Sequence, residues 1–125
     1  DVSTKTIDDE RQPAADPHLR SAREVRGYHI EASDGSIGHV EDFLLDEQTW
    51  TIRYIIIDTR NWWPGRKVVV SPHWISAVRW ADSTVAVALL RDEIKNAPEY
   101  DPSRGLTVEY AVRLDDYYAR LGRKE

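Results

Sequence analysis

The sequence predicts a small, mainly β domain with short helices at its periphery. Between residues 28 and 90, six short segments of alternating or β-branched apolar residues follow one another, separated by residues typical of turns. The chain has 125 residues, of which 41% are hydrophobic, and this is the size of one domain with a substantial core. We therefore expect one barrel or sandwich rather than two independent domains.

The chain begins with a segment of different composition. Residues 1–18 are rich in Asp, Ser, Thr and Pro, and we expect them to form a flexible acidic tail or linker. A helical turn is predicted over residues 19–26, because Ser21 and Glu24 have the spacing of a capping box and Gly27 can end the turn.

The first two predicted strands form a hairpin. Residues 28–33 alternate apolar and polar side chains, and the dipeptide Asp34-Gly35 that follows is a strong signal for a two-residue hairpin loop. This loop would pair Ser33 with Ser36.

The returning strand covers residues 37–46, and its alternation is lost near Gly38, which indicates a bulge. The next strand, residues 50–59, contains three consecutive isoleucines at 55–57 and is predicted to be central. Three further strands are predicted over residues 67–71, 74–80 and 84–89.

Two helices are predicted after the strands. Residues 91–96 form the first, which Pro98 stops, and residues 106–121 form the second. The apolar side chains of the second helix share one face: Tyr110, Leu114, Tyr117 and Leu121. This stripe is expected either to cover the barrel or to seal a homodimer.

Composition excludes several classes of function. The chain has 22 acidic and 17 basic residues, a net charge of −5, which disfavours a mainly electrostatic grip on nucleic acid. It has no cysteine, which excludes disulfides and thiolate metal sites. No apolar run is long enough to span a membrane, so we expect a soluble protein.

Neither the histidines nor the acids suggest an active site. With the hairpin register above, His39 lies opposite Ile30 and His29 opposite Val40, so the two imidazoles point to opposite faces unless a bulge at Gly38 reverses this. The adjacent acids Glu41-Asp42 and Asp46-Glu47 likewise point to opposite sides of a strand. We therefore predict no catalytic residues, no metal and no cofactor.

The segment between the third and fourth strands carries the strongest functional signal. It places Trp62 and Trp63 in a Pro-Gly loop, beside Arg60 and Arg66. Exposed Trp and Arg often anchor protein interfaces, so these four residues are predicted to bind a partner protein. Two alternatives stay open: one indole covers the end of the barrel, or the indoles stack on RNA bases beside the cations.

The chain resembles the PRC-barrel domain family over residues 19 to 102. The matching segments are residues 19–27 (LRSAREVRG), 34–42 (DGSIGHVED), 52–58 (IRYIIID), 68–74 (VVVSPHW), 90–94 (LRDEI) and 97–100 (APEY). The family is named for the photosynthetic reaction centre, whose H subunit carries such a barrel on the cytoplasmic side. A ribosome maturation factor carries another.

The resemblance implies a small, strongly bent antiparallel β-barrel that serves as a non-catalytic binding or scaffold module in bacteria. It leaves residues 103–125 as a C-terminal helical extension. Structural roles are expected for five residues of the matching segments: Gly35, Gly38, Asp42, Asp58 and Pro72. The expected setting is the cytoplasm, with any membrane association through a partner. Neither the membrane helix of the H subunit nor the second domain of the maturation factor is present in these residues, so neither specific function is carried over.

Overall fold

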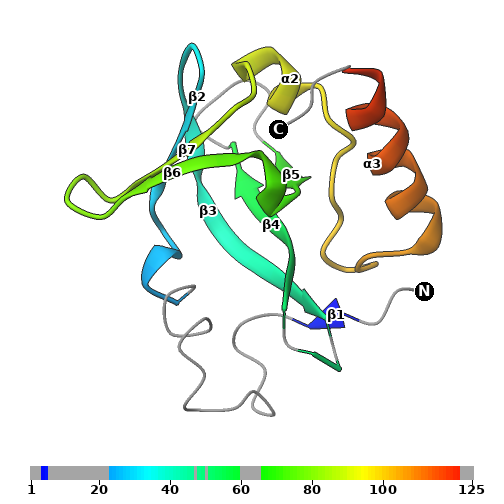
Figure 1. Cartoon of the computed structure of the whole chain (residues 1–125). Helices are drawn as coiled ribbons and strands as arrows, with labels where there is room; N and C mark the ends of the chain where they lie inside the picture. The colour runs from blue at the N-terminus through cyan, green and yellow to red at the C-terminus, as the bar shows by residue number, and fades with distance from the viewer. Residues whose placement is uncertain (1–3, 6–22, 47, 50, 60–65, 122–125) are drawn as a thin grey trace.

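A computed structural model describes residues 4–5, 23–46, 48–49, 51–59 and 66–121. The predicted mainly β class is correct, and the described residues form one sheet with helices beside it (Figure 1). The strands are β1 (Thr4–Lys5), β2 (His29–Ala32), β3 (Gly35–Asp46), β4 (Ile52–Asp58), β5 (Lys67–Val70), β6 (Ile75–Arg79) and β7 (Thr84–Val87). The helices are the 3-10 turn η1 (Pro72–Trp74), α2 (Arg91–Lys95) and α3 (Val108–Arg120), preceded by a helical turn at residues 23–25.

The sheet is mixed rather than wholly antiparallel as predicted, and over the described residues it is not closed, so the predicted barrel is not confirmed. Its strand order is β5-β4-β3-β2-β7-β6, with β1 added beside β3. The pair β2–β7 is parallel, and no pairing joins β5 to β6 among the described residues. Alternating side chains predict which face a residue occupies but not the direction of the neighbouring strand, so the sequence pattern could not reveal the parallel pair.

The register of the β2–β3 hairpin also differs from the prediction. Ala32 pairs with Gly35, so the turn consists of Ser33 and Asp34 rather than Asp34 and Gly35. Gly35 has a φ of 143°, which favours glycine at this first paired position.

A bulge in the same hairpin brings two histidines together. Glu31 pairs with Ser36 but Ile30 pairs with Gly38, so Ile37 is the extra residue. This shift places His29 directly opposite His39. The prediction that the two imidazoles point to opposite faces is therefore wrong, because paired residues share a face.

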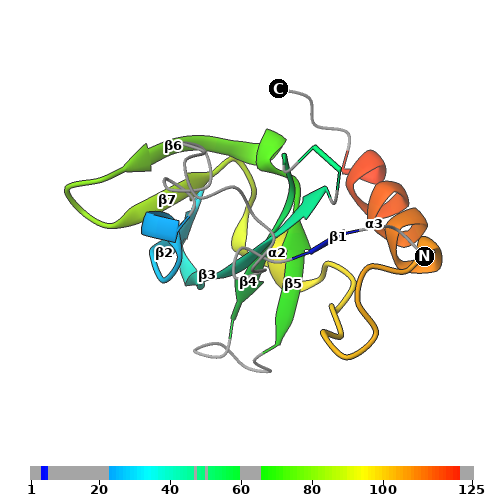
Figure 2. The same ribbon diagram turned by 90° about the horizontal axis from the view of Figure 1, so that it is seen from below.

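Apolar side chains form two hydrophobic cores, one on each face of the sheet. The first core lies where the sheet curves over itself, and its members without solvent exposure include Ile30, Ile37, Leu45, Ile57, Val68, Val70, Leu89 and Ile94. The second core lies between α3 and strands β3, β4 and β5, and consists of Leu44, Ile56, Val69, Tyr100, Leu106, Tyr110 and Leu114. Helix α3 thus lies at one end of the molecule and the β6–β7 hairpin at the other (Figure 2).

The apolar stripe of α3 covers its own sheet, which was the first of the two predicted alternatives. Thr107 caps the helix, and its hydroxyl accepts a hydrogen bond from the Tyr110 amide at 3.1 Å. Tyr110 and Leu114 are buried, and the Tyr117 hydroxyl donates to the Glu93 carbonyl at 2.7 Å. A homodimer through this stripe, which also includes Leu121, would require α3 to leave the sheet.

Two further predictions concern the ends of the chain and the membrane. Most of residues 1–18, predicted as a tail, lie outside the described residues, but Thr4–Lys5 pairs with β3. None of the described helices is long and apolar enough to cross a membrane.

Candidate functional site

The predicted partner-binding loop falls almost entirely outside the part of the chain that the structure describes. Arg60, Trp62 and Trp63 belong to residues 60–65, whose structure is not described, so their role stays a prediction. Arg66 is described, and its guanidinium Nη2 donates to the carbonyl oxygens of Lys95 and, at 2.9 Å, Ala97. These carbonyls end α2, so Arg66 has a structural role that the sequence did not indicate.

Asp42 lies where β3 is bulged against β4. The register shifts between Val40 and Asp42, and the Asp42 Oδ1 accepts a hydrogen bond from the Phe43 amide at 2.7 Å. Its Oδ2 lies 3.8 Å from the Arg26 guanidinium. The carboxylate therefore contacts a backbone amide at a bulge.

Asp58 ends β4 and is fully buried. Strand β3 lies very close to the backbone of Asp58 at Gly38. A Cβ atom placed on Gly38 would lie only 2.2 Å from the Asp58 carbonyl oxygen. Only glycine, here with a φ of 150°, allows β3 to lie this close to β4. Of the other predicted structural residues, Pro72 is the first residue of η1, where its missing amide hydrogen has no effect.

The structure places one indole where the sequence did not predict it. Trp50, Trp74 and Trp80 lie in strand contexts of the sequence, which favour packing in the core or against side chains of the same face. Trp74 is buried, and Trp50 lies outside the described residues. Trp80 is 53% exposed, so it is not part of the core. It lies at the start of the turn between β6 and β7, beyond the last strand residue, where alternation no longer directs it inward.

Trp80 is held by one aromatic neighbour. Its ring packs edge-on against Tyr28, with ring centroids 6.1 Å apart and an interplanar angle of 75°. The turn that follows contains Ser83 with a φ of 54°, a left-handed conformation that is uncommon for residues other than glycine. The Trp80 indole is therefore partly exposed to solvent, and its contact with the Tyr28 ring fixes its orientation.

The hairpin that carries Trp80 projects from the body of the molecule (Figure 1). Strand β6 is the last strand of the sheet, and among the described residues only β7 pairs with it. Ser76, Ala77 and Arg79 of β6 are exposed. An edge of this kind leaves backbone groups open to pairing with another chain.

A shallow hollow of about 360 Å³ lies beside β6, on strands β2 and β7. Small side chains account for it, because Ala32, Ala86 and Ala88 leave space that larger residues would fill. The Arg79 Nη1 and Glu31 Oε1 atoms, 2.8 Å apart, form an ion pair that also lines the hollow. This edge of the sheet therefore presents three kinds of group to another protein: the Trp80 indole, the backbone groups of β6 and the ion pair between Arg79 and Glu31.

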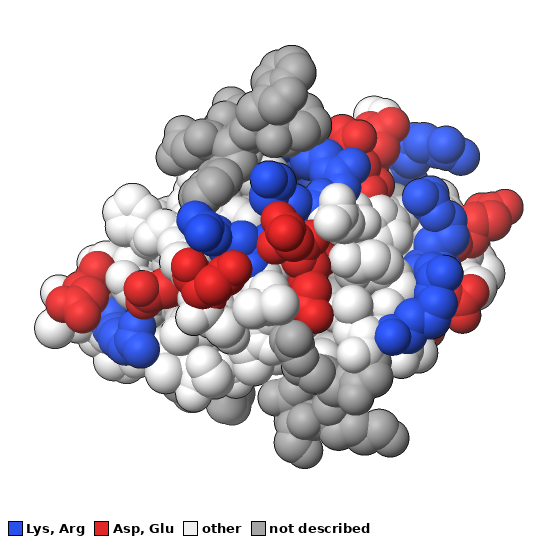
Figure 3. Space-filling model, turned by 90° about the horizontal axis from the view of Figure 1, so that it is seen from above, with Lys and Arg blue, Asp and Glu red and all other residues white. Residues whose placement is uncertain are grey.

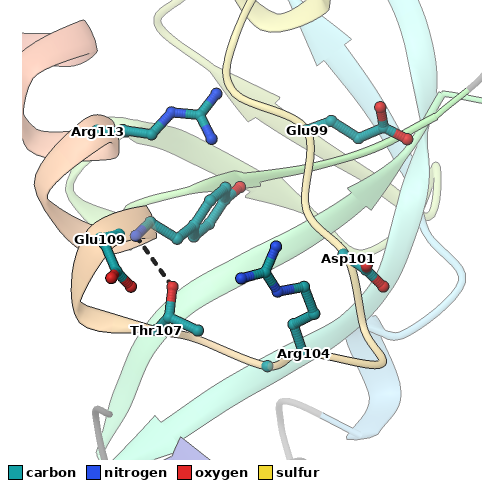
Figure 4. A pocket seen from close by; sticks show the side chains of 8 residues that line it. Glu99, Asp101, Arg104, Thr107, Glu109 and Arg113 are labelled. Atoms are coloured by element: carbon teal, nitrogen blue, oxygen red, sulfur yellow. Dashed lines mark hydrogen bonds between the residues drawn. The ribbon is translucent and has the colours of Figure 1, made fainter.

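A second hollow, also of about 360 Å³, lies between the first turn of α3 and the segment before it (Figure 4). Arg104 and Arg113 extend over it from two sides. Three carboxylates line it as well, those of Glu99, Asp101 and Glu109. The mixed charges give it no strong preference for an anion or a cation.

Charges of both signs are interleaved on the face seen in Figure 3. Basic side chains gather in the upper centre and along the right of this view, with another at the left, and acidic side chains lie beside each of them. Among the described residues this face thus presents no unbroken basic surface of the kind that grips a phosphate backbone.

A cluster that could hold a metal lies where β3 pairs with β4. Ligand atoms of His39, Glu41 and Asp58 lie within 4.8 Å of one another. His39 and Asp58 are paired across β3 and β4, and Glu41 is the extra residue of the bulge between Val40 and Asp42, so the cluster depends on long-range pairing that the local sequence does not show.

Comparison with known proteins agrees with this architecture. No curated protein matches the chain. The family model of the PRC-barrel domain matches residues 17–87, which include β2 to β7 and more than half of the chain. The protein therefore belongs to the PRC-barrel family.

Proposed function

We propose that this protein is a non-catalytic binding module that docks a partner protein on its β6–β7 hairpin. The observation that carries the proposal is Trp80, a half-exposed indole at the tip of a projecting hairpin. Membership of the PRC-barrel family supports a binding or scaffold role. The cytoplasmic setting expected from the family resemblance is part of the same proposal.

Three properties favour Trp80 as the anchor of the interface: its residue type, its restricted side chain and the strand edge beside it. Tryptophan is enriched among the few interface residues whose loss costs about 2 kcal/mol or more. Tyr28 already restricts the indole on one side, so binding loses less side-chain entropy than it would for a free side chain. The adjacent edge of β6 can add main-chain hydrogen bonds to a strand of the partner.

The predicted loop with Arg60, Trp62 and Trp63 is proposed as a second contact with the partner. Arg66, the fourth residue of that prediction, contributes indirectly, since its guanidinium binds the end of α2. The alternative is RNA binding through the same indoles, and it predicts a steep dependence of binding on salt concentration.

The experiment is capture of partners from a lysate of the source cells at low and high salt. Trp80→Ser is compared with Val112→Ser, a matched control because Val112 on α3 is also 53% exposed. Loss of one anchor worth about 2 kcal/mol weakens binding by roughly 30-fold. We expect one protein to be retained at high salt by the parent and by Val112→Ser and to be lost from Trp80→Ser.

Equal retention of that protein by the parent and Trp80→Ser would contradict docking through the hairpin. A Trp62→Ala/Trp63→Ala variant tests the second contact in the same experiment. RNA that is captured at low salt, released at high salt and lost from this double variant would favour the alternative. Circular dichroism of each variant establishes that it is folded.

A further inference from the structure

One histidine and two carboxylates converge on a single face of the sheet, outside the proposed docking hairpin. His39 pairs with Asp58 across β3 and β4, and Glu41 lies two residues further along β3. The His39 Nε2 lies 3.9 Å from the Glu41 Oε1. The ligand atoms of all three side chains lie within 4.8 Å of one another.

Lys67 borders this cluster on the side of β5. Lys67, which pairs with Asp58 on its other side, places its Nζ 3.4 Å from the Glu41 Oε2. The two oxygens of Glu41 thus face different neighbours, Lys67 on one side and His39 on the other.

The cluster combines a fixed ligand with two movable ones. Asp58 is fully buried and is paired with neighbours on both sides, so its position is set by the sheet. The side chains of His39 and Glu41 are 33% and 34% exposed. An ion can therefore reach the cluster from the side of His39 and Glu41, and these two side chains can rotate to meet it.

We propose that His39, Glu41 and Asp58 bind one divalent transition-metal ion of the Zn²⁺ type. Zn²⁺ takes imidazole nitrogen and carboxylate oxygen ligands at about 2.0–2.2 Å, and three protein ligands leave a fourth position for water. One imidazole among the ligands favours Zn²⁺ over Mg²⁺, which prefers oxygen ligands alone. Lys67 would stay on the second oxygen of Glu41 and hold that carboxylate in orientation. The ion would join β3 to β4.

The test is titration of the whole protein with Zn²⁺ alone by calorimetry, and with Co²⁺ followed by its visible absorption. We expect one ion per chain, and a rise in Tm of roughly 10 °C when the free ion is at 100 times its Kd. His39→Gln and Glu41→Gln should each weaken binding at least about tenfold. His73→Gln is the matched control, because His73 is an exposed histidine outside the cluster, and it should bind as the parent does.

The following binding results would overturn the proposal. They are the absence of saturable binding by the parent, equal affinity in His39→Gln and the parent, and binding that depends on His29 but not on Glu41. The last would place the ion between the two opposed imidazoles instead. Competition by Mg²⁺ at similar concentration would also contradict a site selected by an imidazole ligand. Because His39 and Glu41 are partly exposed, both variants should fold, and circular dichroism checks this.

Discussion

The Tyr118 hydroxyl donates a hydrogen bond to the carbonyl oxygen of Val69 at 3.0 Å, and so joins the last turns of α3 to β5. The Tyr118 ring also packs against Trp74, with centroids 5.9 Å apart. The C-terminal helix is therefore an integral part of the domain. Its tyrosines, which could have served an interface between two chains, bind the backbone of their own chain.

The first prediction concerns stability at alkaline pH. Burial raises the pKa of Tyr118, so the folded protein keeps this phenol protonated where the unfolded chain, with a pKa of about 10, has lost the proton. The stability from this residue is fully present below about pH 10 and is lost as the pH rises above that value. Urea unfolding from pH 7 to 11 should show this loss, and Tyr118→Phe should show less of it. An identical alkaline loss in Tyr118→Phe and the parent would contradict the assignment.

The second prediction concerns the close approach of β3 and β4. Gly38→Ala should destabilise the fold by about 3 kcal/mol or more, because the new Cβ would overlap the Asp58 carbonyl oxygen. Gly27→Ala is the matched control: its φ is also positive, at 94°, but nothing lies within 4 Å of the added atom. It should cost only about 1–2 kcal/mol. Equal losses of unfolding free energy in the two variants would show that backbone strain alone is responsible.

The third prediction concerns the second core. Leu114 is 1% exposed and lies in the second core with Ile56 and Val69, so Leu114→Ala should cost about 2–5 kcal/mol of unfolding free energy. Val112→Ala, on the exposed side of the same helix, should change stability by no more than about 0.5 kcal/mol. Denaturation curves measure both. A negligible effect of Leu114→Ala would mean that α3 does not pack on the sheet.

The fourth prediction separates the structural role of Arg66 from partner binding. Arg66→Ala removes donors from the carbonyls of Lys95 and Ala97 and should cost roughly 1–3 kcal/mol. Arg104→Ala, at an exposed arginine, should have little effect. If Arg66→Ala has the same free energy of unfolding as the parent, the contact with α2 does not stabilise the fold. Arg66 would then be available to bind a partner protein.

The strands were predictable because their side chains are alternating or β-branched apolar residues and because turn residues such as Gly35, Gly65 and Asp82 separate several of them. The predicted and observed strands agree to within two residues at most ends, as for residues 52–58 inside the predicted 50–59. The C-terminal helix was predicted over 106–121 and is observed over Val108–Arg120, because its apolar stripe has the helical period.

Features that depend on single-residue shifts or on distant neighbours were not predictable. The bulge at Ile37 changes the partner of His39 from Ile30 to His29; the lost alternation near Gly38 indicates a bulge but does not specify the resulting register. The exposure of Trp80 depends on where β6 ends, and the boundaries of strands are the least certain part of a pattern. The contact of Arg66 with α2 joins residues about thirty positions apart, so local sequence carries no signal for it.

The measurement that tests the docking proposal most directly is hydrogen–deuterium exchange of the protein with and without the partner captured through Trp80. Docking on the hairpin predicts slower exchange of the amides of residues 75–83 in the complex, because the open edge of β6 and the turn after it become covered. Protection confined to α3, residues 108–120, with residues 75–83 unchanged, would contradict the proposal.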